Sequence, residues 1–251
     1  MKIRLDVALT ELKLAKSRTL AQKIIAEGCV NVNGNIILKP SEKVDCETDK
    51  INVSDNPECT KYVGRGGFKL EKAVEEFSID LKGKYCLDIG ASTGGFTDCM
   101  LKNGAEKVYA VDVGKDQLDP SLKINPKVIS LEQLDIRNAS DEIPDKVDFI
   151  SIDVSFISLK LILPEIIRFS SEQAQCVALI KPQFENGKNK NGKNGIIKDN
   201  KVHKRIVDDI VSFAEGLGFC SITVIPSPIN GGDGNKEFLM HFTVNKIEDK
   251  Q

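Results

Sequence analysis

The stretch that decides the fold is YCLDIGASTGGF, residues 85–96. An apolar run leads to Asp88, a turn containing Gly90 and Gly94 follows, and a helical pattern covers 94–103. In an open α/β sheet, ligands bind outside the carboxyl ends of the strands, usually at the first turn from strand to helix. Because glycine accepts backbone conformations that other residues avoid, this turn can approach a ligand closely. The stretch therefore predicts a ligand site at the start of an α/β domain.

Strand and helix patterns alternate around this stretch. Apolar strands that alternate with helices predict a mostly parallel α/β sheet, Rossmann-like and covered on both faces. Only a short loop separates the last two of the seven strands, so we expect these two to form an antiparallel edge pair. The expected strands are 85–90, 107–113, 128–136, 147–155, 176–182, 220–228 and 237–244. The expected helices are 68–77, 94–103, 158–169 and 201–217.

The glycine turn fits some ligand classes better than others. A phosphate-binding loop needs Gly-Lys-Ser/Thr, which is absent here, and the dinucleotide pattern GxGxxG fails at Ser92. A carboxylate before the glycines suits a cationic ligand such as S-adenosylmethionine, which carries an ammonium and a sulfonium and no phosphate. Strand-end aspartates can accept ribose hydroxyls or contact adenine, although each could also serve only as a turn former. The predicted cofactor-binding residues are Asp88, Gly90, Ala91, Ser92, Thr93, Gly94, Asp112, Val113, Asp135, Ile136 and Asp153.

Four further residues could meet at the same sheet edge. Asp153 ends the fourth strand, Lys181 ends the fifth, Glu237 begins the last, and Lys69 lies in the first helix of the large domain. A ribose 2′-hydroxyl is weakly acidic, so a nearby lysine can take its proton or stabilise the alkoxide, while carboxylates orient the lysines. The same four residues could equally form a surface ion-pair network. They are the predicted catalytic residues.

The first 59 residues form a different pattern, with helices expected at 4–13 and 17–27 and strands at 29–34, 35–39 and 50–54. We expect this α+β unit to span 1–59, a linker 60–66, and the large domain 67–251. The run SRTLAQKIIAEGCVNVNG, residues 17–34, resembles the RNA-binding domain named after ribosomal protein S4. A generic capping subdomain is the alternative.

Basic residues cluster in three segments although the formal net charge of the chain is −2. The segments 1–39, 61–72 and 181–205 carry net charges of +4, +3 and +6. Three basic segments together favour a nucleic-acid partner, whereas each alone could simply solubilise a loop. Phe156 is the candidate for stacking on an extruded base, and His203 is expected to contact solvent or a phosphate. The predicted RNA-binding residues are Arg4, Lys13, Lys16, Arg18, Lys23, Arg65, Phe156, Lys188 and Lys193.

Several classes of protein are disfavoured by the sequence. No stretch approaches the roughly 18 apolar residues of a membrane span, and charges interrupt the N-terminal region where a secretory signal would be apolar. The seven cysteines form no CxxC pair and the two histidines lie far apart, so we expect reduced thiols, no metal and a cytoplasmic protein. A membrane-lysing toxin and a non-catalytic RNA-binding assembly factor are the alternatives to an enzyme.

The order of motifs in the chain resembles that of the TlyA family, also called hemolysin A. The strings that carry the resemblance are GRGGFKLEKA, LDIGASTGGFTDC, YAVDVG, LDIRN, DFISIDVSFISL, LIKPQFE and NGGDGNKEFL. The resemblance implies an S4-like domain before an FtsJ-type class I methyltransferase that uses S-adenosylmethionine. It also implies methylation of the ribose 2′-hydroxyl of cytidine in small-subunit or large-subunit rRNA, or both, by a Lys-Asp-Lys-Glu tetrad at Lys69, Asp153, Lys181 and Glu237. We expect a monomer or a weak homodimer that acts on rRNA or ribosomal subunits, away from membranes.

Overall fold

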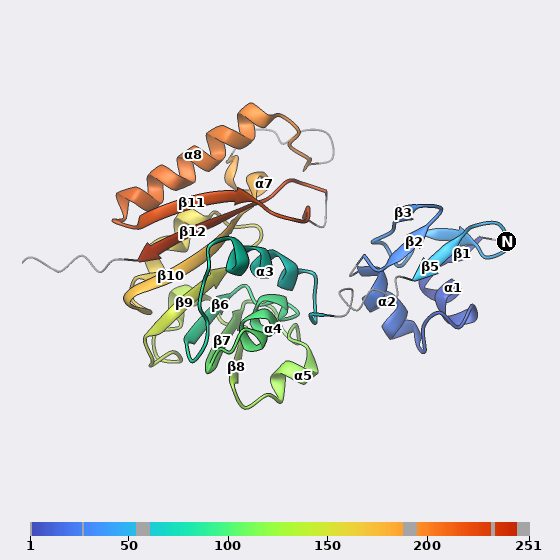
Figure 1. The fold of residues 1–251 in the computed structure, drawn as a ribbon, viewed down its shortest axis with the longest axis horizontal. Helices are drawn as coiled ribbons and strands as arrows, with labels where there is room; N and C mark the ends of the chain where they lie inside the picture. Colours follow the sequence, from blue (N-terminus) through green and yellow to red (C-terminus); the bar gives the residue numbers. More distant parts are fainter. Residues whose placement is uncertain (1, 27, 54–60, 188–194, 232–233, 245–251) are drawn as a thin grey trace, which may run out of the picture. The chain divides into compact units, whose positions relative to one another are not determined.

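The chain divides into two units, residues 1–65 and 66–251, in a computed structural model that describes residues 2–26, 28–53, 61–187, 195–231 and 234–244 (Figure 1). The division falls between Arg65 and Gly66. Each unit has its own hydrophobic core, as expected of segments that can fold separately.

The described residues of the small unit form two helices, α1 (Leu5–Glu11) and α2 (Arg18–Ala26), and five short strands. Strand β2 (Val30–Val32) pairs with β3 (Asn35–Ile36) and β5 (Ile51–Val53), and β1 (Lys2–Arg4) pairs with β4 (Lys43–Asp45). The expected helices and the three-stranded sheet are confirmed, whereas β1 and β4 were not predicted. The Asn33-Gly34 turn has two positive φ values, 53° and 87°, which suit the twist of a tight hairpin.

The large unit is built on a seven-stranded sheet, which confirms the predicted fold class. The spatial order is β11-β12-β10-β9-β6-β7-β8. Strands β11 and β12 form the expected antiparallel pair at one edge of the sheet, where β11 is outermost and β12 also runs antiparallel to β10, and β8 lies at the other edge. The strands are β6 (Tyr85–Ile89), β7 (Lys107–Asp112), β8 (Val128–Glu132), β9 (Val147–Ile152), β10 (Ser170–Ile180), β11 (Cys220–Pro226) and β12 (Phe238–Val244).

Three long helices, α3 (Gly66–Glu76), α4 (Gly95–Lys102) and α8 (Asn200–Gly216), agree with the expected positions. The expected helix at 158–169 is wrong. Its place is taken by a 3-10 turn, η3 (Leu159–Leu161), and a short helix, α6 (Leu163–Ile166), because Pro164 has no N–H for a continuous helix. Strand β8 is shorter than expected, since Gln133 has φ 56°. The remaining short elements are α5 (Pro120–Lys123), η2 (Ile136–Asn138) and α7 (Pro182–Glu185).

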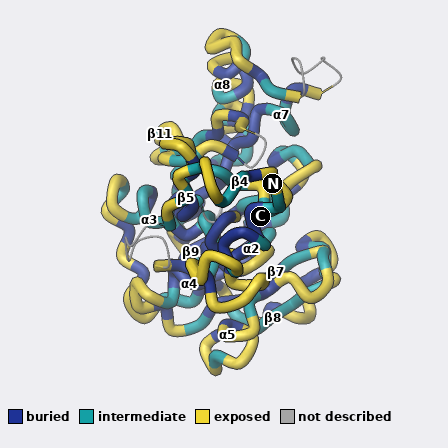
Figure 2. The backbone as a smooth tube through the Cα atoms, turned by 90° about the vertical axis from the view of Figure 1, so that its right-hand side faces the viewer, coloured by how far each residue is buried: buried dark blue, intermediate teal, exposed yellow. Residues whose placement is uncertain are grey.

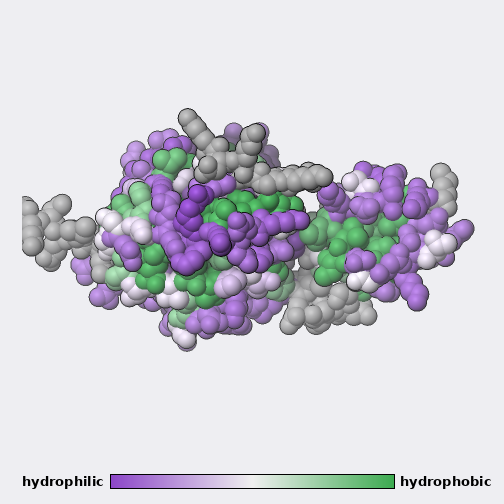
Figure 3. All heavy atoms as spheres, turned by 90° about the horizontal axis from the view of Figure 1, so that it is seen from above, coloured by the Kyte–Doolittle hydropathy of each residue, from purple (hydrophilic) through white to green (hydrophobic). Residues whose placement is uncertain are grey.

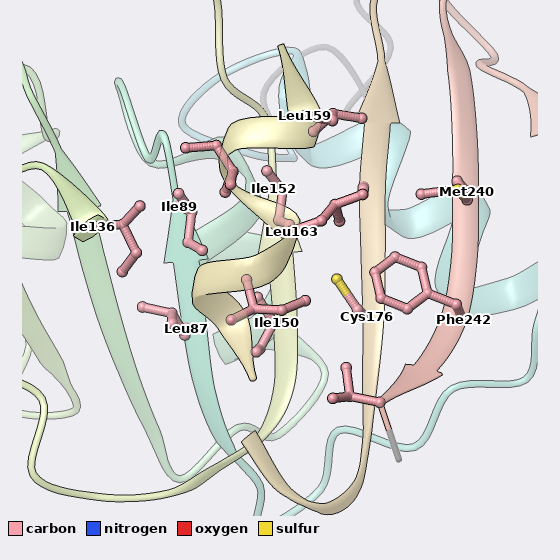
Figure 4. Packing of buried hydrophobic residues seen from close by; sticks show 14 of the residues in the cluster. Leu87, Ile89, Ile136, Ile150, Ile152, Leu159, Leu163, Cys176, Met240 and Phe242 are labelled. Atoms are coloured by element: carbon pink, nitrogen blue, oxygen red, sulfur yellow. The ribbon is translucent and has the colours of Figure 1, made fainter. Parts of the chain in front are cut away.

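The sheet is covered on both faces. Leu87 and Ile89 of β6 belong to one core cluster with residues of η3, α6 and α8, and Figure 4 shows part of it around Leu163 and Cys176. Since side chains alternate along a strand, Asp88 points the other way, where it bonds Thr97 of α4. Figure 2 shows buried and exposed residues along α8, as expected of a helix with one face on a core. Figure 3 shows that the visible face of each unit is mostly hydrophilic, with hydrophobic residues among the hydrophilic ones.

Candidate active site

A cavity of about 380 Å³ lies at the carboxyl ends of the parallel strands. Gly90 follows β6, Asp112 ends β7, Asp135 lies beyond β8, and Asp153 follows β9. All four residues line the cavity, together with Ser92, Val113 and Ile136 from the predicted cofactor set. Parallel strands bring residues that are distant in sequence to one edge, so the structure brings these candidates together.

The turn after β6 is shaped by its glycines. Gly90 has φ 83°, and a Cβ there would lie 2.5 Å from the carbonyl oxygen of Asp153, so no side chain fits. Gly94 has φ 94° and lies against Leu118 and Leu122. Ala91, Thr93 and Gly94 form the turn without lining the cavity. The turn therefore presents the backbone at Gly90, together with Ser92, to a ligand in the cavity.

The carboxylate of Asp112 is held between two turns. Its Oδ2 accepts a hydrogen bond from the backbone N–H of Ser92 and its Oδ1 accepts one from that of Gly114, both at 2.7 Å. A carboxylate oxygen has lone pairs for more than one donor, so Asp112 can still accept hydroxyl groups from a ligand. The fixed orientation suits recognition of a ribose diol.

Asp88 lies beneath the turn and does not line the cavity. It is fully buried, and it accepts hydrogen bonds from the hydroxyls of Thr97 at 2.6 Å and Ser151 at 2.8 Å. Burial raises the pKa of Asp88 to about 6, although these hydrogen bonds oppose the shift. In this arrangement Asp88 supports the turn from below.

The wall beside Asp135 is apolar. Asp135 caps η2 through the N–H of Arg137 and pairs with its guanidinium, and this hydrogen-bonded pair lowers the pKa of Asp135. Leu134 and Ile136 line the cavity next to it. None of the described lining residues is Lys or Arg, so the cavity offers no cation to a phosphate. A carboxylate for a diol, a close backbone turn and apolar walls fit the adenosine portion of S-adenosylmethionine.

The four predicted catalytic residues form one chain of contacts beside this cavity. Lys69 Nζ lies 2.6 Å from Glu237 Oε2 and 3.9 Å from Asp153 Oδ2. Lys181 Nζ lies 2.6 Å from Asp153 Oδ1 as an ion pair. Lys69, Lys181 and Glu237 are buried, and Asp153 is partly exposed in the cavity. Two cations alternate with two carboxylates, which is the arrangement that makes buried charge tolerable.

Ser155 is a site residue that sequence reasoning missed. Lys181 Nζ donates a hydrogen bond to Ser155 Oγ at 2.8 Å, and Ser155 lines the cavity. The sequence pattern assigns both Ser155 and Ser158 to capping of the next helix, and only Ser158 does so, at the start of η3. The position of Ser155, two residues after Asp153 in the same strand-end turn, was the feature of the sequence that could have indicated its role.

Phe156 is the most exposed large hydrophobic side chain in the site, at 89%. Its φ of 65° is a conformation that bulky residues rarely adopt, and such strain is concentrated at functional sites. The ring lies 4.9 Å from that of Phe184 and lines the cavity. An aromatic face is thus presented to solvent beside Asp153.

The basic residues of the small unit differ in their partners. Asp6, which is fully buried, accepts hydrogen bonds from Arg4 and Arg18. Lys13, Lys16 and Lys23 are exposed, and Arg65 is half-buried. Lys188 and Lys193 lie outside the described residues.

The described residues contain neither a metal-binding cluster nor a membrane-spanning helix. No group of three or more His, Cys, Asp or Glu side chains is placed to hold a metal ion. No helix in those ranges is both long and apolar enough to cross a membrane.

Comparisons with known proteins agree with this geometry. Residues 62–244 match the model of the FtsJ-like methyltransferases, and residues 3–51 match the S4 domain. Hemolysin A of Brachyspira hyodysenteriae is 43% identical over 96% of this chain and 100% of its own length. The 16S/23S rRNA (cytidine-2′-O)-methyltransferase TlyA of Mycobacterium tuberculosis is 40% identical over 94% and 88%.

A solved structure agrees over nearly the whole chain. A hemolysin-like protein of Streptococcus thermophilus is similar with a TM-score of 0.75 and 41% identity, covering 98% of this chain and 89% of that one. The chain therefore belongs to the FtsJ-like methyltransferases, in the TlyA and hemolysin A family with its N-terminal S4 domain.

Proposed function

We propose that the chain transfers a methyl group to the ribose 2′-hydroxyl of a cytidine in rRNA of the small subunit, the large subunit or both. The observation that carries the proposal is the series of charged contacts Glu237–Lys69–Asp153–Lys181, which reaches the cavity at Asp153. The printed name of the mycobacterial relative, a 16S/23S rRNA (cytidine-2′-O)-methyltransferase, supports the choice of substrate.

S-adenosylmethionine is the cofactor of this methyltransferase. Asp112 would accept its ribose hydroxyls, Leu134 and Ile136 would contact its adenine, and the turn at Gly90 would approach its methionine portion. When bound, the cofactor supplies an electrophilic methyl group on a sulfonium.

Lys181 is the residue that we assign to the reacting hydroxyl. Its amine lies 2.6 Å from Asp153 and 2.8 Å from Ser155, and both of these residues line the cavity. The amine would receive the hydroxyl proton or, as an ammonium, stabilise the alkoxide. Lys69, fixed by Glu237, adds a second positive charge close to Asp153. Because displacement at a methyl group needs alignment above all, a rigid set of charges is the main contribution of the chain.

The RNA would be held by other parts of the chain. Five basic residues of the small unit would contact RNA phosphates: Arg4, Lys13, Lys16, Arg18 and Lys23. Contacts with phosphates dominate the affinity of proteins for RNA and make it depend on salt. Phe156 would stack on the base of the target nucleotide after its extrusion from a helix. In this proposal the basic residues and Phe156 bind the RNA, whereas Lys181 and its partners carry out the chemistry.

The experiment that tests the proposal uses methyl-tritiated S-adenosylmethionine with separate ribosomal subunits that lack the modification. We expect tritium in alkali-resistant dinucleotides, which form only where a 2′-hydroxyl is blocked, and none with Lys181→Met. The labelled subunit then identifies the substrate. Absence of label on both subunits and on naked rRNA, in protein that binds the cofactor, would contradict the proposal.

A further inference from the structure

A second cavity, of about 500 Å³, lies in the large unit between the first half of α8 and the turn from β11 to β12. Its apolar wall includes Val207 of α8, Val224 of β11 and Phe238 of β12. Since β12 runs against the parallel strands, its start and the end of β11 lie at the carboxyl edge of the sheet. The cavity therefore opens at the same edge as the active site.

His203 gives this cavity an unusual wall. It lines the cavity with only 4% of its surface exposed, so the expectation that it contacts solvent or phosphate is wrong. Its ring lies edge-on to Phe238 at 5.7 Å, and neither ring nitrogen has a hydrogen-bond partner among the described residues. A buried polar atom without a partner costs free energy, so these nitrogens point to a polar group supplied by a ligand.

The cavity touches the active site through one residue. Glu237 lines it and also holds Lys69 at 2.6 Å, while Asp153, 3.9 Å beyond Lys69, lines the cofactor cavity. The described linings of the two cavities have no residue in common. Two separate spaces thus flank one chain of charges.

Two cations stand at the rim of the second cavity. Lys236 and Lys204 line it and are exposed. Lys204 Nζ lies 2.7 Å from Asp208, but both side chains are largely in solvent, where such a pair is weak and a phosphate can compete for the ammonium. An apolar wall, unpaired ring nitrogens and a cationic rim match the base and the phosphate of one nucleotide.

We propose that this cavity holds the nucleotide adjoining the methylated one in the substrate RNA, with its base against Val224 and Phe238 and its base edge on His203. The inference rests on the proposed function. The reacting ribose belongs beside Lys181 and the cofactor cavity, so an occupant that reaches the tetrad only through Glu237 is its neighbour in the strand. Lys236 contacts the phosphate of that neighbour.

The first test measures steady-state methylation of the ribosomal subunit that accepts the methyl group. Asn230→Trp fills the cavity from its exposed rim, and Lys236→Ala removes the cation. We expect each to raise KM for the subunit about tenfold, the effect of one stacked base or one phosphate contact, with cofactor affinity unchanged. The matched control, Lys201→Ala, removes a lysine of α8 that does not line the cavity and leaves KM unchanged. Unaltered KM in both cavity variants, with cofactor affinity as in wild type, overturns the inference.

The second test locates the RNA. A photoreactive azidophenylalanine at Lys204, with the same group at Lys201 as control, is cross-linked to the subunit and mapped by reverse-transcription stops. We expect the Lys204 stop within one nucleotide of the methylated position. A stop at a remote nucleotide, or a cross-link to a ribosomal protein, overturns the inference while methylation by the same variants upholds the proposed function. Loss of all methylation by the wild-type chain would instead overturn both.

Discussion

Both units pair basic side chains with carboxylates that are little exposed, and they differ in how far the cations are exposed. In the small unit, the side chains of Arg4 and Arg18 are 39% and 56% exposed around a fully buried Asp6. In the large unit, Lys69 and Lys181 are only 10% and 11% exposed. The pairing is the same, and access of solvent to the cation is what differs.

This difference assigns different roles to the two clusters. An exposed guanidinium held by Asp6 can meet a phosphate of any sequence, and salt screens that contact. A buried ammonium meets only a group that enters the cavity, and its interactions are stronger in a water-poor site. The small unit is therefore suited to affinity and the large unit to chemistry.

The largest effect is expected from a substitution at Asp153, which lies at the centre of the cluster of Lys69, Asp153, Lys181 and Glu237. Asp153→Asn keeps the shape of the side chain and removes the charge between the two lysines. We expect methyl transfer to slow by about 10²–10⁴-fold, because Lys181, the assigned acid-base group, loses the carboxylate that positions its amine. The rate is measured with tritiated cofactor. Asp209→Asn is the matched control, since it breaks the exposed ion pair with Lys160, and the rate of methyl transfer should stay as in wild type. An equal loss of rate in both variants would refute a special role for the ion pair of Asp153 and Lys181.

The next effect concerns the cofactor alone. Asp112→Ala removes the carboxylate that we assign to the ribose hydroxyls. The backbone N–H groups of Ser92 and Gly114, which donate to this carboxylate in the wild-type chain, lose their acceptor. We expect affinity for S-adenosylhomocysteine to fall about 10–100-fold, as for loss of charged hydrogen bonds. Isothermal titration calorimetry measures it. An affinity within twofold of wild type would remove Asp112 from the cofactor site.

A smaller effect is expected where the large unit meets the target base. Phe156→Ala should raise KM for the RNA substrate about tenfold, because one stacked base is lost, and leave cofactor affinity unchanged. Phe156→Tyr keeps an aromatic face and should behave as wild type. If Phe156→Tyr loses as much as Phe156→Ala, stacking is not the role of this residue.

The smallest expected effect is on stability and depends on pH. Hydrogen bonds from Arg4, with those from Gln22 and Arg18, lower the pKa of Asp6, so its contribution to stability is present above about pH 4 and is lost as the pH falls further. Burial raises the pKa of Asp88 to about 6, so its contribution is present below about pH 4 and is lost as the pH rises towards 6.

Calorimetric unfolding of the aspartate-to-asparagine variants checks these opposite signs. The destabilisation by Asp6→Asn should shrink as the pH is lowered from 5 to 3. The difference between Asp88→Asn and wild type should move in favour of the variant as the pH is raised from 4 to 7. Differences that do not change with pH would contradict both assignments.

The sequence predicted the strand ends well because topology alone places them. Gly90, Asp112 and Asp153 each follow or end a parallel strand, and parallel strands share an edge. The inward direction of Asp88 was not predicted, because it depends on which face of β6 meets α4. The role of Ser155 was not predicted because its partner, Lys181, is 26 residues away and follows another strand.

His203 shows how a composition argument can mislead. Lysines and arginines around it suggested a solvent-facing position. The buried residues of α8, however, are His203, Ile206, Ile210 and Ala214, an apolar stripe at helical spacing that includes the histidine. Helical periodicity was thus the better guide, and the cavity beside this stripe could be seen only in three dimensions.

The most direct test of the account is a single-turnover measurement at increasing concentrations of the substrate subunit. Lys181→Met, in the buried cluster, is compared with the double variant Lys13→Gln/Lys16→Gln, which removes two exposed lysines of the small unit and leaves the pairing of Asp6 intact. We expect Lys181→Met to lower the rate at saturation by at least about 100-fold with unchanged apparent Kd for the subunit. The double variant should raise that Kd about tenfold, less so at high salt, with an unchanged rate at saturation. If both variants change the same parameter, the division of binding and chemistry between the two units is wrong.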